Sequence, residues 1–466
     1  MNKKRSKNQN RFKLTTISIE KALKLLLLFR NKISANESQI KGFASFIGEK
    51  GWDLFQNECL MNREKINDSI RQRNLVCPNL KRGENCDVKL DWSKPTDVFN
   101  IKVETDAPGL DVCYDGTAIL IKGKPSRVGG YNIRIIHRYD DYFNLTNELI
   151  IECKVDVIAN PKDLWEDKPT PQDIEYYKPD HNIQDQFGVK KIVAASQRGR
   201  SHAHEAKPRD DDFSIFYDEE SRWHILAVAD GAGSATFSRE GARIACETVK
   251  EFCLHALKSK DNRLEATMTS WAKEKSSTEL KKKAHTEAYN ILGNAAFSAF
   301  QAIEREAKDK GRSIKLYATT LLLSICKKTS YGWIIASFWV GDGGIGLYDK
   351  EKKYLHLMGI PDGGEYAGQT RFLTNHEIFV DAINRIRVDT VEDFTALILM
   401  SDGITDPKFE TDANLQNIDN WNKLWDDINA EVNLNLVDSN TKYQLLKWMD
   451  FWSIGNHDDR TLAMIF

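Results

Sequence analysis

The chain has 466 residues, of which 41% are hydrophobic and 29% charged, the composition of a folded protein of two to three domains. Its formal net charge of −2 gives no reason to expect nucleic acid or an anionic membrane as a partner. The eight cysteines include no Cys-x-x-Cys pair, which argues against a zinc site, and we expect a reduced, cytoplasmic protein.

The first predicted elements are a disordered basic tail over residues 1–15 and a helical region over residues 16–90. Six of the first 13 residues are Lys or Arg and none is acidic, so the tail is either solvated or an arm for an anionic surface. Apolar residues such as Leu23 and Leu26 recur at helical spacing in the second region. The leucine cluster is too short to span a bilayer and has no cleavage site, so we predict neither a membrane span nor a signal peptide.

Residues 91–158 are predicted to form a small all-β domain, because short alternating strands such as Tyr131–Ile136 are separated by glycine and proline turns. The Pro108-Gly109 turn, the Gly123-Lys-Pro125 turn and the Gly129-Gly-Tyr131 strand resemble the immunoglobulin-like domains of bacterial proteins. That resemblance implies a binding or spacer module with a β-sandwich fold. Residues 159–187 contain four prolines among acids and are predicted to be a linker.

In residues 188–466 the predicted strands and helices occur in groups, which favours an α+β domain. Trp223–Ala229 and Ala396–Met400 are apolar enough to be buried strands, and Arg239–Leu257 has the pattern of an amphipathic helix.

Acidic residues adjoin the predicted strands of this domain. A carboxylate at the end of a buried strand is costly unless its charge is compensated, and a cation does so directly. Mg²⁺ and Mn²⁺ take carboxylate, carbonyl and water oxygens as ligands, and two such ions can activate a shared water towards a phosphate ester. One Asp-Gly pair alone is a common turn, so the prediction depends on four clusters occurring together. The clusters are Asp210 to Asp212, Asp230-Gly231, Asp402-Gly403 and Asp458-Asp459.

The order of these motifs resembles the type 2C family of metal-dependent serine/threonine protein phosphatases. The resemblance implies a central β-sandwich of two antiparallel sheets flanked by helices, and two Mg²⁺ or Mn²⁺ ions, with a third as an open alternative. It also implies hydrolysis of phosphoserine and phosphothreonine by a water that bridges two metals. The motifs are Asp210-Asp211, Val228-Ala-Asp-Gly231, Ala318-Thr-Thr-Leu321, Val340-Gly-Asp-Gly343, Met400-Ser-Asp-Gly403 and Asp458-Asp-Arg-Thr461.

Site residues follow from the same resemblance. Asp230 matches the aspartate that bridges both metals, whereas Thr319, Thr320, Gly341 and Asp342 match structural or supporting positions. The implied metal ligands are Asp210, Asp211, Asp230, the carbonyl of Gly231, Asp402 and Asp458. The residues expected to take part in catalysis are Asp230, Asp402, Asp458, Arg209 and His202.

The general acid is open at this point, because Ala232 stands where many members of the family have a histidine. His202, His204 or a metal-bound water could serve, and His202 belongs to a Gly-x-x-His pattern similar to that of a bacterial subgroup. Arg198, Arg200 and Arg209 are the candidates for binding phosphate, which a guanidinium fork suits.

The expected substrates are phosphoproteins, which include a cognate serine/threonine kinase or its targets. The alternative function is a catalytically weak or inactive regulatory module with the phosphatase fold, which acts through its N-terminal domains. A nuclease is disfavoured because the sequence has no basic stripe with interleaved aromatic residues. The glycine-rich segment Pro361–Thr374 is predicted to be either a loop near the substrate or a plain surface loop.

Overall fold

A computed structural model gives the structure of the chain, and it describes residues 60–466 except 62, 96–97, 99, 140–147, 363–369 and 436–437. Two compact units make up the chain, Met1–Leu164 and Trp165–Phe466. The predicted basic tail and most of the predicted helical region lie outside the described residues. Among the helices that are described, none combines the length and apolar character that crossing a bilayer requires.

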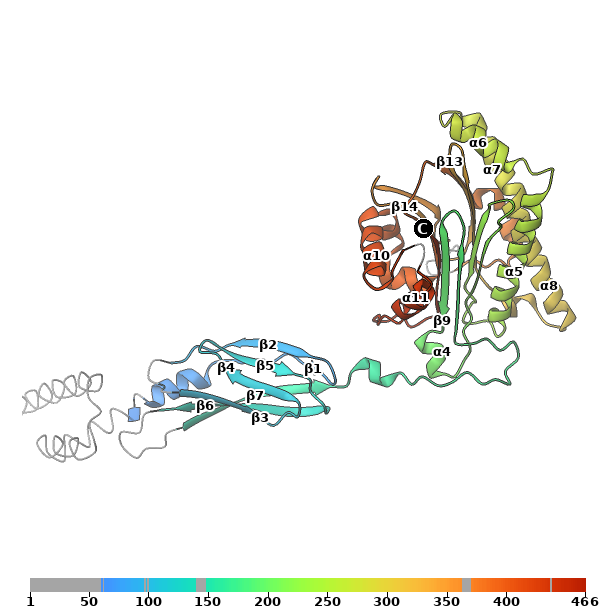
Figure 1. The fold of residues 1–466 in the computed structure, drawn as a ribbon. Helices are drawn as coiled ribbons and strands as arrows, with labels where there is room; N and C mark the ends of the chain where they lie inside the picture. Colours follow the sequence, from blue (N-terminus) through green and yellow to red (C-terminus); the bar gives the residue numbers. More distant parts are fainter. Residues whose placement is uncertain are drawn as a thin grey trace, which may run out of the picture. The chain divides into compact units, whose positions relative to one another are not determined.

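The first unit is built from strands. A four-stranded sheet has the order β1-β7-β6-β3 and a three-stranded sheet the order β2-β5-β4 (Figure 1). Both sheets contribute to a single core, for example through Ile119 of β5 and Ile133 of β6. The elements are β1 (Leu80–Lys81), β2 (Cys86–Asp91), β3 (Asn100–Thr105), β4 (Leu110–Tyr114), β5 (Ala118–Gly123), β6 (Gly129–Arg138), β7 (Glu148–Ile158) and the 3₁₀ turn η1 (Pro161–Leu164).

The helical region predicted for residues 16–90 ends too late. The described residues are helical over 60–61 and 63–71, but β1 and β2 follow and pair with β7 and β5. In β2 the apolar residues alternate with charged ones, so that Leu90 is buried while its neighbours are exposed. Alternation with a period of two residues is that of a strand, and pairing with β5 places this segment in a sheet instead of a helix. The immunoglobulin-like identity of the unit stays a prediction.

The second unit contains two antiparallel sheets. The five-stranded sheet has the order β10-β11-β12-β13-β16, and the six-stranded sheet the order β15-β14-β17-β18-β9-β8. Their strands are β8 (His181–Phe187), β9 (Lys191–Gln197), β10 (Asp212–Tyr217), β11 (His224–Ala229), β12 (Leu321–Thr329), β13 (Gly332–Val340), β14 (Gly344–Asp349), β15 (Tyr354–Gly359), β16 (Ile386–Val391), β17 (Ala396–Met400) and β18 (Arg460–Ile465).

Helices cover the outer face of each sheet (Figure 1). The first group packs on the five-stranded sheet and the second on the six-stranded sheet. The first is α5 (Ser238–Lys258), α6 (Leu264–Lys273), α7 (Thr278–Ala288), the π-helical η2 (Tyr289–Gly293) and α8 (Asn294–Asp309); the second is α9 (Asp402–Phe409), α10 (Ile418–Glu431) and α11 (Thr441–Met449). The short elements are α4 (Arg200–His204), η3 (Ile314–Tyr317), η4 (His376–Phe379), η5 (Ala382–Arg385) and η6 (Asp412–Gln416).

The central strands are apolar throughout because both of their faces are buried. In β13, Ile334 and Ala336 face the core shared with the helices, while Trp333 and Ile335 face the core between the two sheets. Successive side chains of a strand point to opposite faces, so a strand between two cores needs an unbroken apolar run. The prediction of an α+β domain is confirmed.

The segment predicted as a linker, 159–187, belongs largely to the second unit. It contributes β8, which pairs along its whole length with β9, and it buries Thr170 and Lys178. The prolines lie before β8, and they do not exclude strand structure after them, where β8 is hydrogen-bonded to β9.

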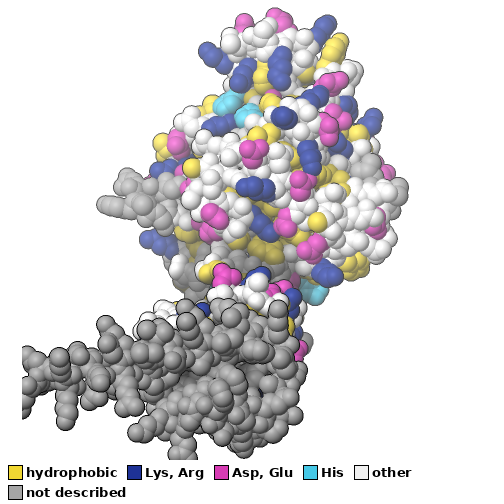
Figure 2. Space-filling model, turned by 90° about the vertical axis from the view of Figure 1, so that its left-hand side faces the viewer, with side chains coloured by type: hydrophobic (Ala, Val, Ile, Leu, Met, Phe, Trp, Pro, Cys, Tyr) yellow, Lys and Arg dark blue, Asp and Glu magenta, His cyan; other side chains and the backbone are white. Residues whose placement is uncertain are grey.

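On the face shown in Figure 2, Lys and Arg side chains lie among Asp and Glu side chains.

Candidate metal centre

The register of the five-stranded sheet brings acidic motifs to one end of it. β10 begins opposite the end of β11, where Asp212 pairs with Ala229, and β12 begins opposite the ends of both β11 and β13. Asp210 and Asp211, which we call the acidic pair, precede β10, Asp230 follows β11, and Asp342 lies in the turn from β13 into the other sheet. These side chains therefore leave the sheet at the same end.

The six-stranded sheet delivers its acidic residues in the same way. β14 begins opposite the end of β17, where Gly344 pairs with Met400, and β18 begins opposite the end of β9. Asp402 comes after β17, Asp458 comes before β18, and His202 lies in α4 after β9. The sheet topology thus accounts for the convergence of motifs that are far apart in the sequence.

Asp230, Asp342 and Asp402 form a first group, with donor oxygens that all lie within 4.8 Å of one another. Among the described residues, Oδ1 of Asp342, Oδ1 of Asp402 and Oδ1 of the nearby Asp210 are buried and have no hydrogen-bond partner. Burial and then the charge of Asp402 raise the pKa of Asp230 well above its usual range, and burial and then Asp342 do the same for Asp402. Such oxygens are stabilised by a divalent cation, and an all-oxygen donor set suits Mg²⁺ or Mn²⁺.

Two threonines hold the backbone of Asp230. Its N–H donates to Thr320 Oγ1 at 2.9 Å, and its carbonyl accepts from the N–H of Thr320 at 2.8 Å and from Thr319 Oγ1 at 2.9 Å. Gly231 forms an isolated β-bridge with Thr319, and a Cβ on Gly231 would lie only 2.9 Å from the carbonyl oxygen of Asp210. The Thr-Thr motif therefore fixes the direction of Asp230, and the glycine leaves room for the acidic pair.

The Ser-Asp-Gly motif at the start of α9 is tied to β18. The N–H of Ser401 donates to the carbonyl of Thr461, and the N–H of Thr461 donates to Ser401 Oγ, both at 3.0 Å. Thr461 Oγ1 donates in turn to Asp211 Oδ2 at 2.7 Å. A Cβ on Gly403 would overlap the carbonyl oxygen of Asp459, so glycine allows α9 to begin directly against this segment.

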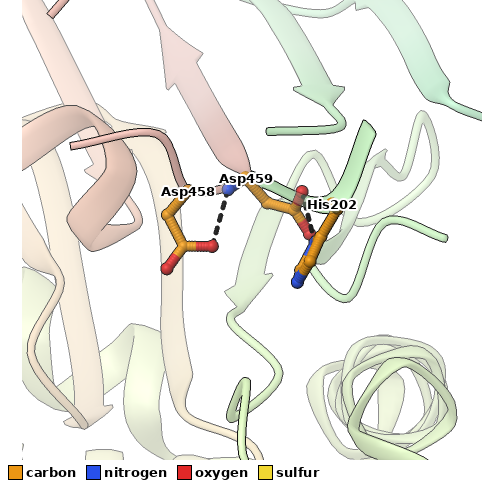
Figure 3. Close-up of side chains that lie close together, drawn as sticks. All are labelled: His202, Asp458 and Asp459. Carbon is orange, nitrogen blue, oxygen red and sulfur yellow. Dashed lines mark hydrogen bonds and ion pairs between the residues drawn. The ribbon is translucent and has the colours of Figure 1, made fainter. Parts of the chain in front are cut away.

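His202, Asp458 and Asp459 form a second group, again with donor atoms within 4.8 Å of one another. The buried Asp459 accepts from the N–H of Gly199 at 2.6 Å and from that of Asp210 at 2.5 Å. Figure 3 shows the Asp459 carboxylate directed at His202, whose Nδ1 lies 3.0 Å from Oδ1, and Asp458 turned towards the N–H of Asp459. Asp459 therefore joins the histidine to the acidic pair.

The charges of the second group are partly balanced within the protein. Burial disfavours a charged His202, but Asp459, Asp210 and Asp458 together raise its pKa to about 9. Burial alone would raise the pKa of Asp459, but His202 and two backbone N–H groups hold it below its usual value. Burial and then the charge of Asp459 raise the pKa of Asp210 to about 6 and that of Asp211 to about 7. Asp210 also faces His202 and Arg239, whose Nη1 lies 3.9 Å from its Oδ1, but these charges do not offset burial and the charge of Asp459.

The arginines predicted to bind phosphate are engaged elsewhere. Arg209 is 1% exposed, and its guanidinium donates to the Ser196 hydroxyl and to the carbonyl of Asp211 at 2.8 Å. Arg198 is buried against two aspartates of the segment before β8, and Arg200 pairs with an aspartate after α11. The predicted catalytic role of Arg209 is corrected, because a buried guanidinium committed to protein oxygens is not placed to meet a substrate.

Two residues of these groups, Asp342 and Asp459, are not among the metal ligands and catalytic residues that the sequence predicts. Asp342 was predicted to be structural, although it follows an apolar strand as Asp230 does, and this shared pattern was the available signal. Asp459 belongs to a predicted acidic cluster, but only the fold brings it to His202. The other candidate histidine, His204, accepts through Nδ1 from the N–H of Glu166 at 3.2 Å and lies outside both groups.

The glycine-rich segment is anchored at the first group. The N–H of Asp362 donates to the carbonyl of Gly341 at 2.8 Å, and Thr370 Oγ1 donates to Asp342 Oδ2 at 2.5 Å. Residues 363–369, between these anchors, lie outside the described residues, so the prediction of a loop near the substrate stays a prediction.

The model of the protein phosphatase 2C family matches residues 198–450, more than half of the chain. The chain belongs to the protein phosphatase 2C family. The matched range contains the acidic pair, Asp230, Asp342 and Asp402, whereas Asp458 lies beyond its end. A search of curated proteins found no match.

Several solved structures are similar to this chain. The serine/threonine phosphatase PstP/Ppp of Mycobacterium tuberculosis is 15% identical, with a TM-score of 0.34, over 59% of this chain and 97% of that one. PppA of Pseudomonas aeruginosa is 13% identical, with a TM-score of 0.34, over 63% and 98%. RsbX, solved in complex with magnesium, is 13% identical, with a TM-score of 0.32, over 61% and 100%.

Proposed function

We propose that this member of the protein phosphatase 2C family is an active, metal-dependent phosphatase of phosphoserine and phosphothreonine in proteins. The observation that carries the proposal is the first group, in which Asp230, Asp342 and Asp402 meet and Oδ1 of Asp342 and Oδ1 of Asp402 are buried with no hydrogen-bond partner among the described residues. A protein keeps such a concentration of buried negative charge where a cation compensates it.

The proposed ligands are Asp230, the carbonyl of Gly231, Asp402 and Asp458, and Asp342 joins them because of its place in the first group. Asp210 and Asp211 support a metal directly or through water. When bound, two Mg²⁺ or Mn²⁺ ions would supply a nucleophilic water at neutral pH and neutralise the oxygens of the phosphate ester.

His202 is the proposed proton donor to the leaving serine or threonine oxygen. Its Nδ1 is engaged by Asp459, while Nε2 lies 3.7 Å from Asp210 Oδ2 on the side of the acidic pair. Asp459 therefore fixes the orientation of the ring and leaves Nε2 as the nitrogen that can move a proton. Arg209 has no proposed role at the substrate.

The test is release of phosphate from phosphothreonine and phosphoserine peptides with Mn²⁺, with Mg²⁺ and with chelator. Asp402→Asn removes a proposed ligand, and Asp389→Asn removes a buried carboxylate outside both groups as the matched control. Metal-dependent turnover that Asp402→Asn abolishes and Asp389→Asn retains would support the proposal. A folded wild type without turnover on either peptide would instead favour the regulatory module.

A phosphoprotein is the proposed partner, and a cognate kinase or its targets remain the predicted source of substrate. Phosphopeptides from different proteins in the same assay would rank the candidates by kcat/KM.

A further inference from the structure

A segment outside the range of the family match contacts the backbone of residues in the metal centre. Residues 165–180, which we call the strap, precede β8 and belong to the second unit. Its N-terminal part packs on α4 and on the segment before β18: the N–H of Lys168 donates to the carbonyl of Ala203 at 3.0 Å, and the ring centroids of Trp165 and His457 are 4.3 Å apart. Its C-terminal part reaches the acidic pair.

Lys178 is the strap residue that contacts the acidic pair. Only 7% of its side chain is exposed, and Nζ lies 2.9 Å from the carbonyl oxygen of Asp211 and 3.5 Å from that of Asp210. Its counter-ion is Asp212, whose Oδ2 is 2.9 Å away. An ammonium group has three donors, and all three have an oxygen partner here.

The main chain of the acidic pair is therefore held from two directions. Lys178 binds the carbonyls of Asp210 and Asp211, the second of which also accepts from Arg209 Nη1 at 2.8 Å, while Asp459 Oδ2 accepts their N–H groups at 2.5 and 3.3 Å. With donors and acceptors both fixed, the backbone cannot rotate to redirect the two carboxylates. The side chain of Asp211 is fixed as well, by Thr461 at 2.7 Å.

Buried arginines hold the strap on both sides of Lys178. Arg239 donates to the carbonyls of Glu175 and Tyr176 at 2.8 and 3.0 Å, which fixes the chain before Lys178. After Lys178, Arg198 Nη1 lies 3.1 Å from Asp180 Oδ1, and Arg209 Nε lies 3.5 Å from the carbonyl of Pro179. The ammonium is thus delivered by a braced segment, which is the condition for a precise contact.

We propose that Lys178 is a positioning residue that sets the affinity of the phosphatase centre for divalent metal by fixing the backbone of Asp210 and Asp211. The inference rests on the proposed function for the presence of metal at these carboxylates. It goes beyond that function because it assigns part of the metal centre to a segment outside the range of the family match.

The test compares two buried lysines of the full chain. Lys178→Met removes the ammonium and keeps most of the side-chain volume. Lys191→Met is the matched control, because Lys191 is also buried and its Nζ lies 3.6 Å from the carboxylate of Asp185 and 2.9 Å from Thr441 Oγ1. Lys191 begins β9, at the end of the strand away from the metal centre. The dissociation constant for Mn²⁺ is measured by titration calorimetry, and stability by thermal unfolding.

We expect both variants to unfold at a lower temperature than the wild type. Lys178→Met should raise the Mn²⁺ dissociation constant by about tenfold or more, the usual effect of losing a group that orients metal ligands. Lys191→Met should leave that constant unchanged. A folded Lys178→Met protein with wild-type affinity, or an equal loss in both variants, would overturn the proposal.

Lys178→Gln covers the case in which Lys178→Met does not fold, because the amide can still donate to one carbonyl. It should weaken Mn²⁺ binding less than the loss of all three bonds, and unchanged affinity would overturn the proposal. Activity is a separate readout. A wild type that binds Mn²⁺ without turnover defeats the proposed enzyme while the titration still decides the role of Lys178, and a wild type that binds no divalent metal overturns both.

Discussion

Replacing Asp230 by Asn should make the metal-free protein more stable and at the same time remove its response to Mn²⁺. Asp230 lies in the first group, where its negative charge is repelled by those of Asp342 and Asp402, with donor oxygens within 4.8 Å of one another. The substitution keeps the shape of the side chain and removes one negative charge. In a site built for a cation, a charged ligand lowers the stability of the metal-free protein, so replacing it raises that stability. Replacing a carboxylate whose charge is satisfied within the fold would lower the stability instead.

The magnitude follows from the geometry. Two like charges 4.8 Å apart repel by roughly 3 kcal/mol at an effective dielectric constant of about 20. The pKa of Asp230 is raised by burial and then by its acidic neighbours, so partial protonation relieves some of this repulsion. We therefore expect a gain of about 1–3 kcal/mol near pH 8 in chelator, or roughly 2–8 °C in the Tm of the second unit.

The assay is thermal unfolding of the full chain in chelator and in Mn²⁺. Wild type should gain about 2.7 kcal/mol at a metal concentration of about 100 times Kd, whereas Asp230→Asn should gain little. The control is Asp389→Asn, because buried Asp389 accepts from Tyr354 and from His356 Nδ1 at 2.6 Å. Its charge is satisfied within the protein, so its loss should cost about 1–3 kcal/mol and leave the response to Mn²⁺ intact.

Two results would refute this reasoning. One is a metal-free Asp230→Asn protein that is less stable than wild type, since repulsion between the carboxylates would then be weaker than the interactions that the aspartate makes in the folded protein. The other is a wild-type response to Mn²⁺ in the variant, which would place the metal elsewhere.

Three further predictions concern stability and metal binding. In chelator, the stability of the protein should fall as pH rises from about 4 to about 7. The folded pKa values of Asp210, about 6, and Asp211, about 7, exceed the usual 3.8, so over this range the folded state holds protons that the unfolded chain has released. Denaturant unfolding at pH 5 and pH 8 measures this, and equal stability at both pH values would contradict it. Gly403→Ala should lower the free energy of unfolding by about 1–3 kcal/mol, measured by thermal or denaturant unfolding, because the added Cβ would overlap the carbonyl of Asp459. Gly233→Ala, with nothing within 4 Å of its Cβ, should be near neutral, and equal effects of the two substitutions would argue against the overlap. Thr320→Val should cost about 1–3 kcal/mol and weaken Mn²⁺ binding in calorimetry, because the buried N–H of Asp230 loses its acceptor, and Thr320→Ser should restore both; a Ser variant as impaired as Val would show that the methyl group matters instead.

Much of the metal centre could be predicted because its residues leave a local pattern. Asp230 and Asp402 follow unbroken apolar runs, and a run of this kind is what a strand between two cores requires. Several Asp-Gly pairs within two residues of the ends of such runs together indicate ligands at strand ends. Asp342 has the same pattern, so its membership of the first group was within reach.

The strap and β8 could not be predicted in the same way. β8 lies at the edge of its sheet, and none of its residues is fully buried, so it lacks an apolar period. Lys178 lies beside a proline and between Glu175 and Asp180, and nothing in this stretch of sequence indicates that three oxygens converge on it. Its contacts join residues more than 30 positions apart.

Arg209 shows the converse error. An arginine before an acidic pair is a reasonable phosphate ligand by its chemistry, but a sequence does not reveal whether the donors of a guanidinium are already taken. Here they are directed at the hydroxyl of Ser196 and the carbonyl of Asp211, and the side chain is buried. The same residue type supports the strap instead of meeting a substrate.

The measurement that tests the central claim most directly is phosphate release from a phosphothreonine peptide during a titration with Mn²⁺, with metal occupancy followed on the same sample. The account predicts that turnover is absent in chelator, rises in step with occupancy, and is lost in Asp402→Asn. Full occupancy of the folded wild type without phosphate release, or release that persists in chelator, would contradict it.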